Sequence, residues 1–180
     1  MTAAPEAVIR FWTEAGPDKW YKKDTAFDTD IRTRFLGTYE AGAAGRLADW
    51  ERPAQGALAL VIVLDQFPRN MFRGNARAFA ADPLAREVAG RAIANGFDTA
   101  TPLPLRQFFY LPYEHSEKLA DQERAVELFR STGNGELVKW AVLHLDIVRR
   151  FGRFPHRNAV LGRATTPDEQ TFLDGGGFAG

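Results

Sequence analysis

Two short motifs place donor-rich side chains directly after a Phe-Pro pair. Residues 67–70 read Phe-Pro-Arg-Asn, and residues 154–158 read Phe-Pro-His-Arg-Asn. Because proline lacks an amide proton and clashes with the preceding turn, each motif predicts that the helix before it ends or kinks there. Arginine and asparagine side chains offer many hydrogen-bond donors. The motifs therefore predict either a recess that binds an anion or ties between helix ends.

More arginines surround the second motif. Between residues 144 and 163 the chain holds five arginines against one aspartate, a local charge of +4 in a chain whose net charge is zero. The planar fork of arginine suits carboxylate or phosphate. If the two turns converge, we expect the ligand-binding residues to be Arg69, Asn70, Arg73, Arg153, His156, Arg157 and Asn158, with Tyr113 in the lining. Asp65 would then orient an arginine.

The same residues also fit an internal network of ion pairs. Asp65 lies four residues before Arg69, and Asp146 lies three before Arg149, which are spacings for local pairs on a helix. Residues 114–127 carry five acidic side chains among seven charges, and we expect them to neutralise arginines elsewhere in the fold. Ion-pair networks imitate functional sites, so the sequence leaves both interpretations open.

One histidine falls inside the apolar stripe of a predicted helix over residues 136–151. His144 is therefore either a buried neutral side chain satisfied by a neighbour, or a general base at the floor of a pocket. The candidate catalytic residues are His144 and His156, with Asp65 or Glu114 as the orienting carboxylate.

Several common chemistries have no support in the chain. There is no cysteine, neither of the two serines sits in a Gly-x-Ser-x-Gly elbow, and no nucleotide-binding glycine motif is present. A metal site would draw on His115, His144, His156, Asp65 and Glu114, but their spacing matches no metal-binding motif. We therefore expect no metal and no cofactor.

Composition indicates an ordinary folded protein. A chain of 180 residues, 45% hydrophobic, is long enough for one domain with its own core, and the zero net charge argues against a globally basic nucleic-acid binder. The start of the chain lacks a signal-peptide pattern, and the longest apolar run, residues 57–64, is far shorter than the ~20 residues that cross a bilayer. We expect a cytoplasmic protein without membrane contact; the oligomeric state stays open.

Apolar residues recur at helical spacing through most of the chain, which predicts an all-α fold of antiparallel helical hairpins. The expected domain spans residues 1–174, followed by a flexible tail at 175–180. The helix after Pro53 is apolar all round, so we expect it to be surrounded by others and to end at Phe67. The other predicted helices cover residues 5–14, 24–44, 83–95 after an N-cap at Asp82, 119–132, 136–151 and a capped segment from Thr166.

Longer strings around both motifs carry a family resemblance. Residues 64–70 (Leu-Asp-Gln-Phe-Pro-Arg-Asn), 152–158 (Gly-Arg-Phe-Pro-His-Arg-Asn) and 16–20 (Gly-Pro-Asp-Lys-Trp) resemble the uncharacterised bacterial family called domain of unknown function 924. The resemblance implies an all-helical fold similar to the right-handed tetratricopeptide-like stacks. It implies no reaction.

Three functions remain as hypotheses. The first is a binding protein that holds a small anionic molecule or an acidic peptide in the recess. The second is an enzyme that uses histidine and carboxylate acid–base chemistry in the same recess. The third is a protein–protein scaffold whose arginine network is structural only.

Overall fold

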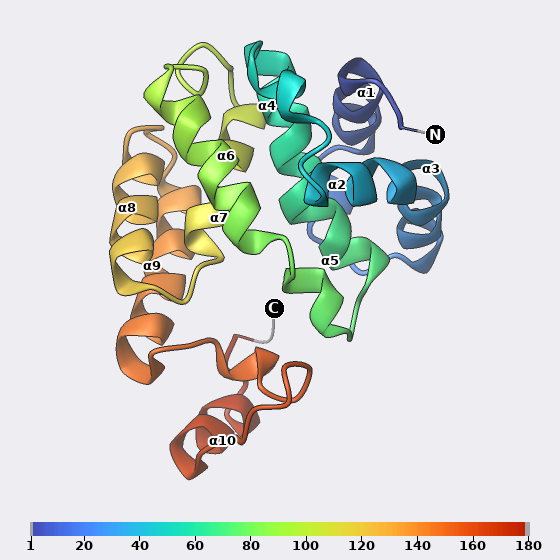
Figure 1. Ribbon diagram of the computed structural model, residues 1–180. Coiled ribbons are helices and arrows are strands. Elements are labelled where there is room, and N and C mark those ends of the chain that lie inside the picture. Colours follow the sequence, from blue (N-terminus) through green and yellow to red (C-terminus); the bar gives the residue numbers. More distant parts are fainter. Residues whose placement is uncertain (1, 179–180) are drawn as a thin grey trace. The chain divides into compact units, whose positions relative to one another are not determined.

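The computed structural model describes residues 2–178, and all regular structure within that range is helical (Figure 1). The chain divides into two compact units. Unit 1 holds the chain up to Arg73 together with Arg77–Pro112, and unit 2 holds Gly74–Ala76 and the chain from Tyr113 onward. The predicted single domain stays a prediction, whereas the predicted all-α class is confirmed.

Six α-helices lie within the described residues 2–110: α1 (Pro5–Ala15), α2 (Pro17–Trp20), α3 (Thr25–Ala43), α4 (Ala54–Val61), α5 (Phe67–Met71) and α6 (Asp82–Ala94). Short 3₁₀ turns join them at η1 (Ala48–Glu51), η3 (Ala76–Phe79) and η4 (Leu105–Phe109), and a π-helical turn, η2 (Ile62–Gln66), lies between α4 and α5. The remaining elements are α7 (Leu111–Glu114), α8 (Leu119–Arg130), α9 (Gly135–Phe151), the 3₁₀ turn η5 (Pro155–Arg157) and α10 (Pro167–Asp174).

Helix α4 is the centre of unit 1, as its uniformly apolar sequence predicted. Every residue from Gly56 to Val61 is buried, because α4 packs against both α1 and α6 (Figure 1). The Phe67 ring belongs to an aromatic cluster with α1: its centroid lies 6.2 Å from that of Phe11 and 5.7 Å from that of Trp12. This core fixes α4 and the turn after it.

Unit 2 is built on the hairpin of α8 and α9. Asn134 begins α9, since its side chain accepts hydrogen bonds from the backbone amides of Glu136 and Leu137. Gly152 ends α9 by adopting a left-handed φ of 69°, which a residue with a Cβ adopts only at a cost. The chain then turns through Phe154 and η5 into α10. The hairpin thus fixes where the second Phe-Pro motif begins.

A capping box begins α10, as the sequence predicted. The Thr166 hydroxyl accepts from the Glu169 amide, and the Glu169 carboxylate accepts from the Thr166 amide. The predicted flexible tail at 175–180 stays a prediction. Its first residues, Gly175 to Gly177, donate backbone hydrogen bonds to the last turn of α10, and residues 179 and 180 lie outside the described range.

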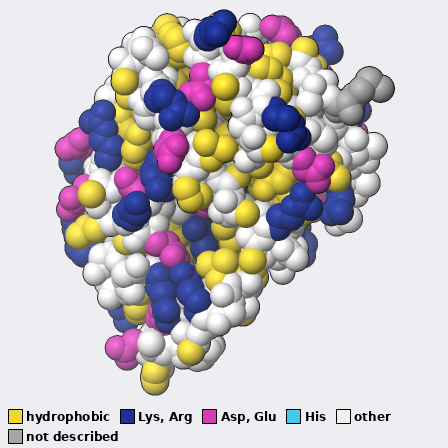
Figure 2. Space-filling view, in the orientation of Figure 1, with side chains coloured by type: hydrophobic (Ala, Val, Ile, Leu, Met, Phe, Trp, Pro, Cys, Tyr) yellow, Lys and Arg dark blue, Asp and Glu magenta, His cyan; other side chains and the backbone are white. Residues whose placement is uncertain are grey.

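The surface carries charges of both signs. In the view of Figure 2, lysine and arginine side chains alternate with aspartate and glutamate rather than gathering into a patch of one sign. None of the helices within residues 2–178 combines the length and hydrophobicity needed to cross a membrane.

Candidate functional site

The helix before the first Phe-Pro motif does not end at Phe67, so the end predicted there is wrong. The helical path continues through Phe67 and Pro68 into α5. It does so by widening to the π-helical turn η2, where the Phe67 amide donates to the Ile62 carbonyl five residues earlier. The wider turn accommodates a proline that has no amide proton and needs room for its ring. Asp65, completely buried, lies within this turn.

Arg69 is engaged by carboxylates of its own unit. Its guanidinium donates to both carboxylate oxygens of Asp82, at 3.0 Å each, and lies 3.4 Å from Asp65. The pair of Asp65 and Arg69 at spacing i, i+4 is the one that the sequence predicted. Arg69 therefore bridges two buried carboxylates.

The other two donors of the first motif meet at Asp28 on α3. The Asn70 amide donates to Asp28 at 2.7 Å, and the Arg73 guanidinium donates to both carboxylate oxygens of the same residue. All three predicted binding residues of the first motif, Arg69, Asn70 and Arg73, thus tie elements of unit 1 together.

The second motif carries a similar network within unit 2. Arg153 binds both oxygens of Glu169, at 2.6 and 2.8 Å, and the Asn158 amide donates to the same carboxylate at 3.1 Å. The Arg153 guanidinium, first among several donors, lowers the pKa of Glu169 to about 2. Glu169 therefore stays charged while it holds η5 and α10 together.

Glu117 is a second anchor for this motif. It accepts two hydrogen bonds from Arg163, at 2.7 and 3.0 Å, and one from the Phe154 amide at 2.8 Å. Burial raises the pKa of Glu117, but these donors outweigh it and the pKa lies below its ordinary value. The predicted pairing of the acidic segment 114–127 with distant arginines is found here. The shared recess of the two motifs stays a prediction, because the motifs belong to different units.

A histidine and a carboxylate meet in the interior of unit 2. Nδ1 of His144, on α9, lies 3.3 Å from Glu114 Oε1 and 2.8 Å from the Trp140 carbonyl oxygen. A carbonyl oxygen only accepts, so we assign the proton to Nδ1 and the lone pair to Nε2. Both side chains are less than a tenth exposed. The contact joins the two catalytic candidates His144 and Glu114, whereas Asp65 belongs to unit 1.

Burial controls the charge of this histidine. It lowers the pKa of His144 to about 4, although the hydrogen bond to Trp140 acts in the opposite direction. His144 is therefore neutral at neutral pH, and its contact with Glu114 is not an ion pair. The charges of His115, Arg157 and His156 lower the pKa further, so all three histidines of the chain belong to one electrostatic cluster.

His156 lies against the same aromatic rings as His144. The ring centroid of Phe154 is 5.6 Å from both imidazoles, and that of Phe178 is 4.5 Å from His144 and 5.2 Å from His156. Burial, followed by the charge of Arg157, lowers the pKa of His156 to about 4. Its Nδ1 is buried and makes no hydrogen bond within the part of the chain that the structure describes.

Arg157 supplies the positive charge of this cluster. It is 7% exposed, donates to the His115 carbonyl at 3.0 Å, and lies over the Phe154 ring at 4.5 Å. We call His144, His156, Glu114, Arg157 and Phe178 the histidine cluster. Tyr113, the predicted lining residue, is half-buried next to Glu114 in the chain.

Sequence reasoning missed Phe178, which lies in the segment predicted to be a flexible tail. No periodicity or motif marks it, because an isolated phenylalanine after three glycines has no helical neighbours to pair with. Glu117, which anchors Phe154, was recognised only as one charge of an acidic segment.

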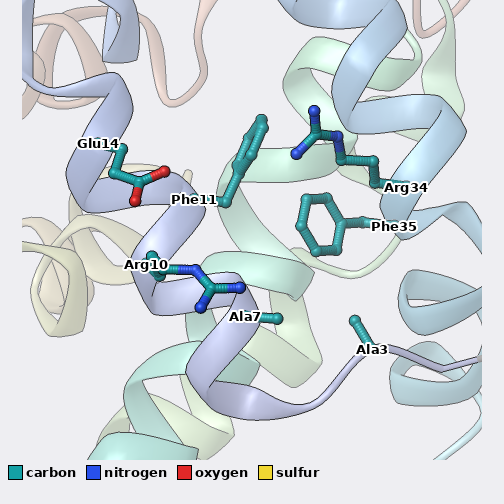
Figure 3. A pocket seen from close by; sticks show the side chains of 7 residues that line it. All are labelled: Ala3, Ala7, Arg10, Phe11, Glu14, Arg34 and Phe35. Carbon is teal, nitrogen blue, oxygen red and sulfur yellow. The ribbon is translucent and has the colours of Figure 1, made fainter.

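A surface pocket lies elsewhere, between α1 and α3 of unit 1. Its cavity volume is about 240 Å³, and Figure 3 shows the rings of Phe11 and Phe35 in it, which meet edge-to-face at an interplanar angle of 62°. Arg10 and Arg34 also line the pocket. Arg34 is paired with Asp30 at 2.6 Å. None of the predicted site residues lines this pocket. Across residues 2–178 no three histidine, aspartate or glutamate side chains are grouped so as to hold a metal ion.

Comparisons with known proteins agree with this architecture. The model of the family described as bacterial protein of unknown function (DUF924) matches residues 8–177. A solved structure of a protein of unknown function from Agrobacterium tumefaciens is 48% identical, with a TM-score of 0.92 over 95% of this chain and 97% of that one. No curated protein matches. The chain belongs to the DUF924 family.

Proposed function

We propose that unit 2 binds a small anionic molecule at the histidine cluster, and that His144 transfers a proton to or from it. The observation that carries this proposal is the contact between Glu114 and Nδ1 of His144 at 3.3 Å. A carboxylate at Nδ1 orients an imidazole and stabilises its protonated form, which leaves Nε2 to exchange a proton with a ligand. Glu114 is thus a positioning residue and His144 the acid–base group.

The charge of Arg157 favours an anion close to the two histidines. Burial is the main cause of the low pKa of both His144 and His156, and the charge of the buried Arg157 lowers both further. A negative group bound beside them would offset the contribution of Arg157 and raise both pKa values. Binding of the anion would therefore make His144 a stronger base than it is in the free protein.

An unsatisfied polar atom also supports a ligand here. Nδ1 of His156 is buried without a hydrogen-bond partner among residues 2–178, and buried polar atoms of this kind are usually satisfied by protein, water or ligand. His156 would hold the ligand through this nitrogen while His144 moves the proton. The carboxylate-bound donors around the two Phe-Pro motifs would then position the surrounding helices; they are Arg69, Asn70, Arg73, Arg153 and Asn158.

Turnover of bacterial metabolites tests the proposal. The protein is incubated with a small-molecule extract of bacterial cells, and acidic compounds are followed by mass spectrometry. We expect the wild-type protein to convert a compound that His144→Gln leaves unchanged, with Glu114→Gln reducing the rate. His115→Gln is the matched control, because His115 binds Arg157 through its backbone carbonyl and keeps that contact.

Three outcomes are informative. Loss of turnover in His144→Gln with an unchanged melting curve supports the acid–base role. Equal turnover by the wild type and His144→Gln contradicts it. If an acidic compound co-purifies with the protein and is not converted, the binding site is supported and the proposed reaction is contradicted.

A further inference from the structure

The phenyl ring of Phe178 rests on both imidazoles of the histidine cluster. Its centroid lies 4.5 Å from that of His144 at an interplanar angle of 66°, and 5.2 Å from that of His156 at 80°. These are edge-to-face contacts, a favourable arrangement for aromatic rings. The ring therefore occupies the space from which a ligand would contact the two histidines together.

A backbone motif at the end of α10 sets the position of this ring. Gly176 has a φ of 77°, its amide donates to Leu173 at 3.2 Å, and the Gly177 amide donates to Phe172 at 2.9 Å. This pair of hydrogen bonds after a left-handed glycine is a Schellman motif. It directs the following residue, Phe178, back toward α9.

Gly177 has no room for a side chain. A Cβ there would lie 2.5 Å from the Phe172 carbonyl oxygen and 2.6 Å from the Phe172 ring. The backbone of residue 177 would have to move to relieve this contact. The position of Phe178 thus depends on a glycine at 177 as well as on its own ring contacts.

Phe178 is held less firmly than the residues beneath it. Phe154 is fully buried between the two histidines and α9, whereas Phe178 is only half-buried and packs on this small core from outside. A half-buried ring after three glycines loses fewer contacts on moving than a core residue does. The ring is therefore suited to leave without unfolding unit 2.

We propose that Phe178 is a displaceable aromatic plug of the histidine cluster, and that the ligand carries a flat aromatic ring together with an acidic group. This proposal rests on the proposed function: it names the class of substrate and the residue that controls access to the site. The aromatic ring of the ligand would replace the phenyl ring against His144 and His156. Its acidic group would lie in the positive field of Arg157.

Benzoate is the simplest probe of this class. The three histidines of the chain give three pairs of imidazole C–H signals in a proton–carbon NMR spectrum, and these report directly on the cluster. We expect benzoate to shift the His144 and His156 signals saturably in Phe178→Ala at about a tenfold lower concentration than in the wild type, because the plug no longer competes. Acetate, which lacks the ring, and benzyl alcohol, which lacks the charge, should act at higher concentrations.

Two further variants separate the plug from general packing. Phe172→Ala removes a ring from the same small core but no ring contact to either histidine, so its benzoate response should equal that of the wild type. Gly177→Ala keeps the phenyl ring of Phe178 but displaces the backbone at residue 177 that positions it. This variant should therefore respond to benzoate like Phe178→Ala.

The outcomes distinguish this proposal from the proposed function. A benzoate response of Phe178→Ala equal to that of the wild type, or to that of Phe172→Ala, would overturn the plug. If benzoate binds to Phe178→Ala but no metabolite is turned over in a His144-dependent way, the plug is supported and the acid–base reaction is contradicted. Equal binding of benzoate and acetate by Phe178→Ala would overturn the aromatic ligand class.

Discussion

Arg69 and Asp82 form two parallel hydrogen bonds of 3.0 Å that join α5 to the start of α6. The same guanidinium contacts Asp65, whose carboxylate is completely buried. A parallel pair of this kind combines strength with fixed geometry. It follows that Arg69 holds the π-helical turn in place, since the buried charge of Asp65 depends on it.

Replacing Arg69 should therefore cost much of the stability of unit 1. Arg69→Met removes the guanidinium that two buried carboxylates share, and we expect the free energy of unfolding to fall by about 3 kcal/mol. Urea denaturation measures the change. Arg52→Met is the control, because the Arg52–Asp49 pair is exposed and should contribute less than about 0.5 kcal/mol. Similar losses in both variants would contradict the assigned role of Arg69.

Glu169 should be the main anchor of α10. Glu169→Gln keeps the capping box but removes the charge that Arg153 binds, so we expect a loss of about 1 to 3 kcal/mol. Glu169→Ala should lose more, because the cap disappears as well. The exposed neighbour Asp168 supplies the control variant Asp168→Asn. Thermal unfolding gives the melting temperatures of the three variants. An equal loss in Glu169→Gln and Glu169→Ala would show that the cap contributes nothing.

The same carboxylate predicts how stability responds to acid. The pKa of Glu169 is about 2, below its ordinary value of 4.5, so the folded state holds the proton less tightly than the unfolded chain does. Its contribution is fully present above pH 4.5 and is lost as the pH falls toward 2. Glu169→Gln should flatten the stability curve in this window alone, as acid denaturation curves would show.

The buried histidines affect the stability of the fold at higher pH than Glu169 does. Because the pKa of His144 is about 4 when folded and 6.5 ordinarily, the unfolded chain binds more protons between these values. Stability should therefore fall as the pH drops from 6.5 to 4, by about 3 kcal/mol for His144. The charged and titratable groups around it are Glu114, His115, His156 and Arg157. In His144→Gln the free energy of unfolding, measured by urea denaturation at several pH values from 4 to 6.5, should change less with pH than in the wild type. An unchanged pH dependence would contradict the neutral state of His144.

A glycine on α4 should be indispensable to the core. A Cβ at Gly56 would lie 2.3 Å from the Trp50 carbonyl oxygen, which belongs to backbone that cannot rotate away. We expect Gly56→Ala to prevent folding or to lower the melting temperature severely. Gly135→Ala is the matched control, since that helical position is open and alanine favours a helix over glycine by up to about 1 kcal/mol. Circular dichroism melts compare the two.

Much of the fold could be predicted from local sequence, because local interactions create it. Helical periodicity, the buried character of α4 and the capping box at Thr166 all follow from residues within a few positions of one another. Pro68 was misjudged because a π-helical turn, which no residue pattern announces, accommodates it inside the helical path.

The candidate site depends on distant pairs, and periodicity cannot supply those. Glu114 and His144 are thirty positions apart in the sequence, and only the packing of α8 on α9 and the turn before it brings them to 3.3 Å. His144 was recognisable as a polar residue in an apolar stripe, but its partner was one of several possible carboxylates. Phe178 could not be assigned at all, since its position depends on the Schellman motif that ends α10.

The wide turn η2 also sets the rotational register of α5. Each residue of an α-helix advances the chain by about 100° around the axis, so one residue more or fewer turns every later side chain by that amount. If the same residues formed a regular α-helix instead of the wide turn, Arg69 would be rotated by roughly that angle away from Asp82. An apparent irregularity of the helix is therefore the spacer that aims its arginine.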